Sequence, residues 1–136
     1  MQAGPLPAIE ISMNVYFVVA AVLIVAIAMA HSWLGERYIL IRLFRRQDIP
    51  HLLGSDDFTK RTLRFAWHLT TITWFGAAAL LVILASVPLD APTRMLSRTI
   101  AIIFLASALV ALIGSRGRHL SWVGFLTIAG LVWMGS

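Results

Sequence analysis

Residues 11–34 read ISMNVYFVVAAVLIVAIAMAHSWL, an apolar run that contains no Asp, Glu, Lys or Arg. A helix needs about 20 such residues to cross the roughly 30 Å hydrocarbon core of a bilayer, because each residue adds about 1.5 Å to its length. The apolar residues are continuous rather than alternating, which favours a helix over a strand of a membrane barrel. The run therefore predicts a first membrane-spanning helix.

Three more apolar runs follow, over about 65–87, 95–113 and 120–135. The last is the shortest and is expected either to cross with little tilt or to thin the bilayer locally. A basic stretch over about 36–64 separates the first run from the second. The chain, residues 1–136, is thus predicted to be a single all-α domain, an integral membrane four-helix bundle.

The composition also indicates that lipid is the main solvent of this chain. Hydrophobic residues make up 60% and charged residues 12%, against about 45–50% and about 25% in soluble proteins, and the mean hydropathy is +0.87. A soluble domain of 136 residues cannot hide that much apolar surface. The absence of Cys excludes a disulfide scaffold, a thiolate nucleophile and metal or iron–sulfur sites ligated by Cys.

The positive charges predict the orientation of the bundle. Most of the 11 Lys and Arg side chains fall in the first and third connections, namely Arg37, Arg42, Arg45, Arg46, Lys60, Arg61, Arg64, Arg116 and Arg118. Cytoplasmic loops carry such an excess, so both termini are expected on the non-cytoplasmic side. This explains the net charge of +5 without nucleic acid as a partner, and it predicts that anionic lipid gathers at the cytoplasmic face.

The connections contain local signals of helix ends. Residues 36–46 alternate basic and apolar side chains at spacings that fit a helix lying at the membrane interface. Pro50 and Gly54 interrupt that segment, and Ser55, followed by two Asp, is the expected N-cap region of the second spanning helix. Thr93 is the expected N-cap of the third.

Two helix faces predict how the first two spans meet. The second span carries a polar stripe, and the first carries a matching stripe of small side chains along which helix backbones can approach closely. The polar stripe of the second span comprises Arg64, His68, Thr71 and Phe75. The small stripe of the first span comprises Ala21, Val25, Ala28, Ser32 and Gly35. We expect the first span to pack on the second along these faces.

Three histidines form the candidate site. His31, His68 and His119 come from three different spans, and all fall at the depth of the cytoplasmic third of the membrane. Ionisable groups inside a membrane are costly and indicate function by default. A fourth, His51, lies in the first connection and is expected to face solvent. In a bundle, side chains from facing helices converge on one interior point, which predicts a shared site near the cytoplasmic face.

Two kinds of cofactor fit three imidazoles. A b-type haem takes two His as axial ligands, with Arg64 and Arg118 placed to hold its anionic propionates. A zinc, iron or copper ion takes all three His directly. Glu36 is a further candidate metal ligand, although its five-residue offset from His31, about 140° around an ideal helix, turns it away unless Gly35 distorts the helix. The expected function is electron transfer, redox chemistry or sensing.

Other function classes remain open. The histidines also suit a non-enzymatic accessory or assembly subunit, in which they join helices within a larger membrane complex or a homo-oligomer. A small transporter active as an oligomer is a third reading, although no acidic residue lies in mid-membrane to carry protons or cations. The chain has no phosphate-binding loop, HExxH or GxSxG motif, and no arrangement of Ser, His and Asp supports catalysis, so catalytic residues stay unassigned.

Three sequence segments resemble those of small four-span bacterial membrane proteins whose activity is unassigned. The segments are HSWLGER at 31–37, RFAWH at 64–68 and GRH at 117–119. The resemblance extends over most of the chain. It implies a four-helix membrane fold in the bacterial inner membrane and implies nothing about activity.

Overall fold

The computed structural model describes residues 13–46, 48–50 and 54–136, and within them the protein is helical throughout its regular structure. Predictions for residues 11–12 and for His51 lie outside the described residues. The elements in chain order are α1 (Val15–Leu34), η1, a π-helix (Gly35–Leu40), α2 (Ile41–Phe44), α3 (Asp56–Ala85), α4 (Ala91–Gly114) and α5 (Ser121–Met134).

The all-α membrane architecture is confirmed in its main part. Three helices are long and apolar enough to cross a membrane, namely Val15–Leu43, Asp56–Ala85 and Ala91–Gly114. The apolar helix α5 has 14 residues and covers about 21 Å at 1.5 Å per residue, which is less than the roughly 30 Å core. A fourth crossing by α5 therefore stays a prediction.

One end of the bundle is tied together by polar contacts. Asn14 caps α1 through its side chain, its backbone N–H donates to the carbonyl of Ala85 at 3.0 Å, and its Nδ2 donates to the carbonyl of Gly135 at 2.8 Å. The hydroxyls of Ser97 and Ser136 share a hydrogen bond of 2.9 Å. The start of α1 and the ends of α3 and α5 therefore meet here, and we call this the closed end.

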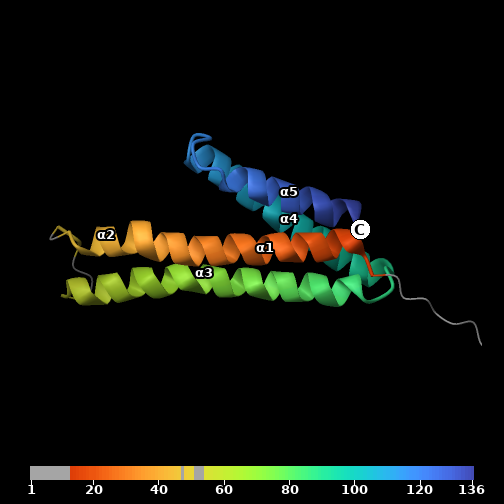
Figure 1. The fold of residues 1–136 in the computed structure, drawn as a ribbon, viewed down its shortest axis with the longest axis horizontal. Coiled ribbons are helices and arrows are strands. Elements are labelled where there is room, and N and C mark those ends of the chain that lie inside the picture. The colour runs from red at the N-terminus through yellow and green to blue at the C-terminus, as the bar shows by residue number, and fades with distance from the viewer. Residues whose placement is uncertain (1–12, 47, 51–53) are drawn as a thin grey trace, which may run out of the picture.

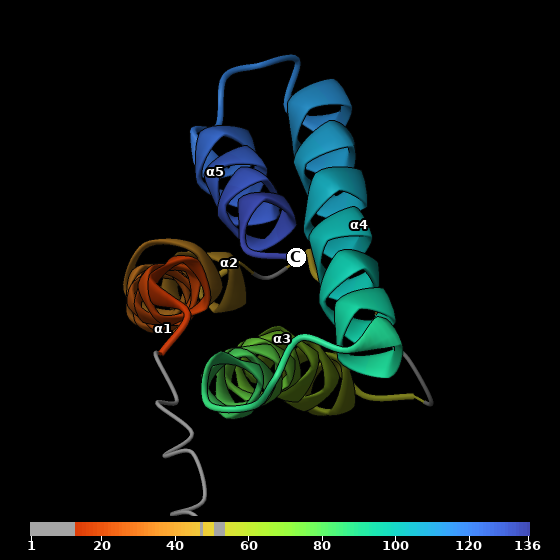
Figure 2. The same ribbon diagram turned by 90° about the vertical axis from the view of Figure 1, so that its right-hand side faces the viewer.

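The opposite end of the bundle is open. Helix α1 packs on α3 and on α5, and α4 packs on α5 (Figure 2). The α4–α5 hairpin diverges from the α1–α3 pair away from the closed end (Figure 1). The buried core lies mainly in the closed half and includes Phe17, Ile24, Leu81, Phe104, Ile128 and Val132. His31 and His119 line a pocket at the open end, whereas His68 contacts Ser32 across the α1–α3 interface.

The connections differ from the sequence expectations in three places. Residues 36–44 are helical, but η1 and α2 continue α1 in line instead of turning along the membrane interface (Figure 1). The expected cap at Ser55 is confirmed, since its hydroxyl accepts the backbone N–H groups of Asp57 and Phe58, but α3 therefore begins at Asp56 and much of the expected loop is helix. The prediction of Thr93 as N-cap is wrong, since the cap of α4 is Asp90.

Candidate functional site

The predicted contact between the first two spans is confirmed. Ala28 of α1 and Thr71 of α3 are buried, and Ser32 meets His68 across the interface. Val25, inside the small stripe, is 36% exposed, and Phe75, at one end of the polar stripe, is 40% exposed, so these two side chains lie at the edge of the interface. The small and polar stripes therefore form the α1–α3 interface at the level of the histidines.

Gly35 shapes this interface. A Cβ added there would overlap the indole of Trp67, so the missing side chain lets Trp67 lie against the helix backbone. The Nε1 group of Trp67 then donates to the carbonyl of His31 at 3.1 Å. The π-helix also begins at Gly35, which is the helix distortion on which the orientation of Glu36 depends. Single π-turns of this kind often occur at functional sites.

On one side of the interface, four side chains form what we call the polar cluster: Ser32, Glu36, Arg64 and His68. The hydroxyl of Ser32 and Nδ1 of His68 share a hydrogen bond of 2.7 Å. Nε2 of His68 lies 3.4 Å from Oε2 of Glu36. Arg64 binds both carboxylate oxygens of Glu36, at 3.0 and 3.2 Å. Both ring nitrogens of His68 therefore face protein partners, and Arg64 is engaged by Glu36.

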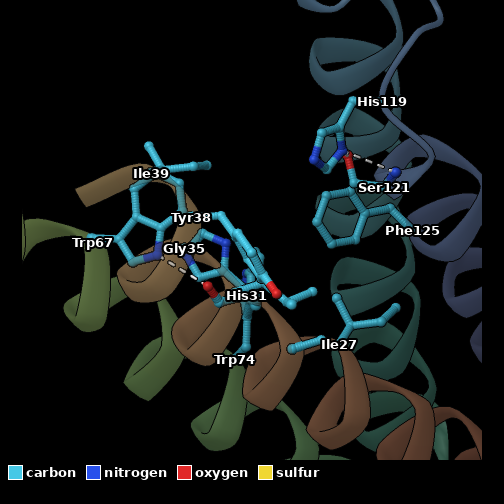
Figure 3. A pocket seen from close by; sticks show the side chains of 12 residues that line it. Ile27, His31, Gly35, Tyr38, Ile39, Trp67, Trp74, His119, Ser121 and Phe125 are labelled. Atoms are coloured by element: carbon cyan, nitrogen blue, oxygen red, sulfur yellow. Dashed lines mark hydrogen bonds between the residues drawn. The ribbon is translucent and has the colours of Figure 1, made fainter. Parts of the chain in front are cut away.

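At the open end lies a cavity of about 510 Å³, which we call the imidazole pocket (Figure 3). It receives side chains from α1, η1, α3 and the start of α5. Its lining comprises Ile27, Ala30, His31, Leu34, Gly35, Tyr38, Ile39, Trp67, Trp74, His119, Ser121 and Phe125. The volume falls within the range of small-molecule and cofactor sites, about 300–1,000 Å³, and the walls are mainly apolar and aromatic as in such sites.

His31 is held rigidly in the wall of the imidazole pocket. Its ring stacks on Trp67 with centroids 4.5 Å apart and planes 2° from parallel, and it meets the ring of Trp74 edge-on at 4.9 Å. Trp74 in turn contacts Phe125 of α5 at 5.3 Å. Nε2 of His31 is buried and has no hydrogen-bond partner among the described residues. Buried polar atoms without a hydrogen-bond partner are rare in native structures, so this one needs an explanation.

His119 lies on the other side of the pocket, across from His31 (Figure 3). Nδ1 of His119 accepts the backbone N–H of Ser121 at 3.2 Å and shares a hydrogen bond of 2.8 Å with the Ser121 hydroxyl. A backbone N–H can only donate, so Nδ1 carries no proton, and the neutral ring has its proton on Nε2. His119 is therefore a hydrogen-bond donor through Nε2.

The structure thus brings two of the three predicted histidines together. His31 and His119 line the imidazole pocket, while His68 belongs to the polar cluster. Among residues 13–46, 48–50 and 54–136, no group of three or more His, Asp or Glu side chains is arranged to hold a metal ion. Arg118 is exposed beside His119.

Sequence reasoning missed several partners of the site. Tyr38 and Phe125 line the imidazole pocket. Tyr38 stands seven residues after His31, a spacing that places both on one face of a helix, whereas Phe125 stands at no such spacing from a histidine. The ion pair of Glu36 with Arg64 could have been predicted from the sequence, because the two residues stand at the same level of neighbouring antiparallel helices and carry opposite charges. Comparison of the chain with family models, curated proteins and solved structures finds no match.

Proposed function

We propose that this chain is an integral membrane protein that binds a b-type haem in the imidazole pocket, for redox chemistry or sensing. In this proposal His31 is the iron ligand and His119 a hydrogen-bond donor to the bound group. The observation that carries the proposal is the buried Nε2 of His31, which lacks a partner among the described residues. A buried nitrogen left unpaired costs free energy, and coordination of iron would remove that cost once a turn of the ring brings this nitrogen to the pocket surface.

The other residues of the pocket suit a haem. Apolar and aromatic walls match the macrocycle, and stacking on Trp67 fixes the orientation of the His31 ring. The exposed Arg118 is a cationic partner for a propionate. Haem iron supplies one-electron and O₂ chemistry, and the protein supplies ligation, burial and hydrogen bonds.

The geometry favours one His ligand over two. Iron binds the unprotonated nitrogen of an imidazole, and neutral His119 carries its proton on Nε2 because Nδ1 accepts the Ser121 N–H. A second axial bond to His119 would require that ring to give up its contacts with Ser121. The proposal therefore favours redox chemistry or sensing over simple electron transfer through a bis-His haem. A directly bound metal ion has less support, since the described residues offer no group of three ligands.

Membrane placement is part of the same proposal. Three helices that can cross a bilayer support a membrane protein. The basic connections at the open end support a bundle of four crossings with both termini on the non-cytoplasmic side of a bacterial inner membrane. The imidazole pocket then lies near the cytoplasmic face.

Titration of haem into the purified protein tests the proposal. In mild detergent, the wild type is expected to bind ferric haem with a one-to-one endpoint in the Soret absorbance. His31→Ala should abolish that endpoint. His119→Ala should weaken binding by about 10–100-fold, as is typical when a hydrogen-bonding partner of a metal site is lost. His68→Ala is the matched control and should bind as the wild type does. Unchanged binding in His31→Ala would refute the ligand assignment.

A second candidate function is a non-enzymatic accessory subunit. It is favoured by the polar cluster, in which His68 uses both ring nitrogens for contacts between helices, as is expected of a residue that joins helices in a membrane. Failure of every variant and of the wild type to bind haem would favour this alternative, and the next step would be a search for a partner by crosslinking in intact membranes.

A further inference from the structure

A second cavity lies at the closed end of the bundle, on the outer face of α4. It has a volume of about 530 Å³ and is lined by Ala91, Arg94, Met95, Arg98, Thr99 and Ile102. We call it the arginine groove. It shares no residue with the imidazole pocket, and neither the proposed haem nor the polar cluster involves it.

In the part of the chain that the structure describes, no carboxylate pairs with the cations of the arginine groove. Arg94 and Arg98 are both exposed and stand one helical turn apart, so their guanidinium groups repel each other. Among the described residues neither forms an ion pair. The nearby carboxylate of Asp90 accepts hydrogen bonds from the backbone N–H and hydroxyl of Thr93. A bridging anion would relieve the repulsion.

Contacts with the rest of the bundle hold the groove in shape. The guanidinium of Arg98 lies 5.4 Å from the ring centroid of Trp133 on α5, a cation–π contact that fixes its place. The Thr99 hydroxyl donates to the carbonyl of Met95 at 2.9 Å, so its proton is used within the helix. One nitrogen of Arg94 donates to the carbonyl of Leu89 at 3.5 Å. The donors that the groove offers to a ligand are therefore the remaining N–H groups of the two guanidinium groups.

The groove changes from cationic to apolar along α4. Arg94 and Arg98 are separated by about 6 Å along the helix axis, close to the thickness of one headgroup layer, about 5–8 Å. Further along the helix, Ile102 is 56% exposed, and Met95 between the arginines is 74% exposed. An amphiphile with an anionic head and an apolar chain can contact both the arginines and the apolar side chains. Free inorganic phosphate can contact only the arginines.

We propose that the arginine groove binds the phosphate of a membrane phospholipid, with preference for an anionic headgroup. Arg94 and Arg98 hold the phosphate oxygens, because guanidinium groups form paired, charge-assisted hydrogen bonds to phosphate. Ile102, one turn beyond Arg98, contacts the upper part of an acyl chain, and Met95 lies beside the phosphate. The lipid belongs to the leaflet at the closed end, opposite the basic connections of the bundle.

Native mass spectrometry of the full-length protein in detergent tests this proposal, with phosphatidylglycerol and phosphatidylcholine as probes. The wild type should retain one phosphatidylglycerol more tightly than phosphatidylcholine. Arg94→Ala with Arg98→Ala should weaken that binding by about 30-fold, since each basic residue near an anionic lipid contributes about a fivefold factor. Arg45→Ala with Arg116→Ala removes the same charge at the open end and should change binding less than about twofold.

Three outcomes would overturn the proposal. The first is an equal loss of lipid in both double variants, which would mean that only total charge matters. The second is equal retention of the two lipids by the wild type, which would remove the headgroup preference. The third is full displacement of the lipid by millimolar inorganic phosphate, which would make free phosphate the ligand. Haem binding is measured separately and is expected to be the same in all of these variants except for any that fail to fold.

Discussion

At the scale of single residues, the hydrogen bond between Ser32 and His68 differs from most hydroxyl contacts within the helices. Thr70, Thr73, Thr99, Ser107 and Thr127 donate to the carbonyl four residues earlier in their own helices, whereas Ser32 reaches another helix at 2.7 Å. Because the contact joins α1 to α3, it contributes to packing rather than to one helix alone.

A double-mutant cycle measures this contribution. Ser32→Ala, His68→Ala and the double variant should give a coupling energy of about 0.6–1.7 kcal/mol, the range found for side-chain hydrogen bonds between membrane helices. The measurement is reversible unfolding in mixed micelles. Ser107→Ala paired with His68→Ala is the control and should show no coupling, since the two residues share no contact. A coupling near zero for Ser32 would contradict the geometry.

Gly35 allows a second test on single residues. Gly35→Ala pushes a methyl group into the indole of Trp67, and such overpacking is expected to cost about 1–3 kcal/mol of stability. Gly76→Ala is a matched control in α3, because nothing lies within 4 Å of its added Cβ; it should stabilise its helix by up to about 1 kcal/mol. Near-ultraviolet circular dichroism should report a changed tryptophan environment in Gly35→Ala alone. Equal effects of the two substitutions would exclude a close contact at Gly35.

At the scale of helices, the start of α4 depends on one carboxylate. The backbone N–H of Thr93, and then its hydroxyl, hold the pKa of Asp90 below its usual range by hydrogen bonding to the charged form. A lowered pKa in the folded state means that the stabilisation is complete above the ordinary Asp pKa of about 3.9 and is lost as the pH falls through the lower folded-state pKa.

Asp90→Ala should therefore lower the unfolding temperature at pH 7, with the same difference from the wild type down to about pH 5. The difference should shrink only below about pH 4, as the carboxyl of the wild type becomes protonated. Asp90→Asn should keep most of the stability, since Asn also caps helices well. A difference that disappears already between pH 7 and pH 5 would point to some other group.

The helices also show what the sequence could and could not predict. Apolar runs and the Ser55 cap predicted most of the helices, because lipid exposure and capping act through neighbouring residues. The π-helix that begins at Gly35 and the close approach of Trp67 to this glycine were not predictable as such, since Trp67 stands on another helix. The three histidines were predicted at one depth, but depth does not determine which side of a helix faces which partner. His68 contacts Ser32 and Glu36 and so belongs to the polar cluster, whereas His31 lines the imidazole pocket.

At the scale of the whole molecule, the chain is expected to cross the membrane four times with both termini outside the cytoplasm. Because the chain has no Cys, a maleimide can label it only at an introduced cysteine. Labelling of single-cysteine variants therefore shows on which side of the membrane each position lies. In intact cells, a membrane-impermeant maleimide should label Pro92→Cys and Ser136→Cys but neither Arg45→Cys nor Arg118→Cys. Labelling of Arg118→Cys and Ser136→Cys from the same side would show that α5, with its 14 residues, does not cross.

The most direct test of the central claim is the visible spectrum of the full-length protein purified from haem-replete cells, oxidised and reduced, with extracted haem counted per chain. The account predicts about one haem b per chain and a spectrum of iron with a single His ligand, because His119 donates from Nε2 rather than ligating. Sharp bands typical of two His ligands would mean that His119 or His68 rearranges to bind iron. A colourless protein that takes up no added haem would contradict the account.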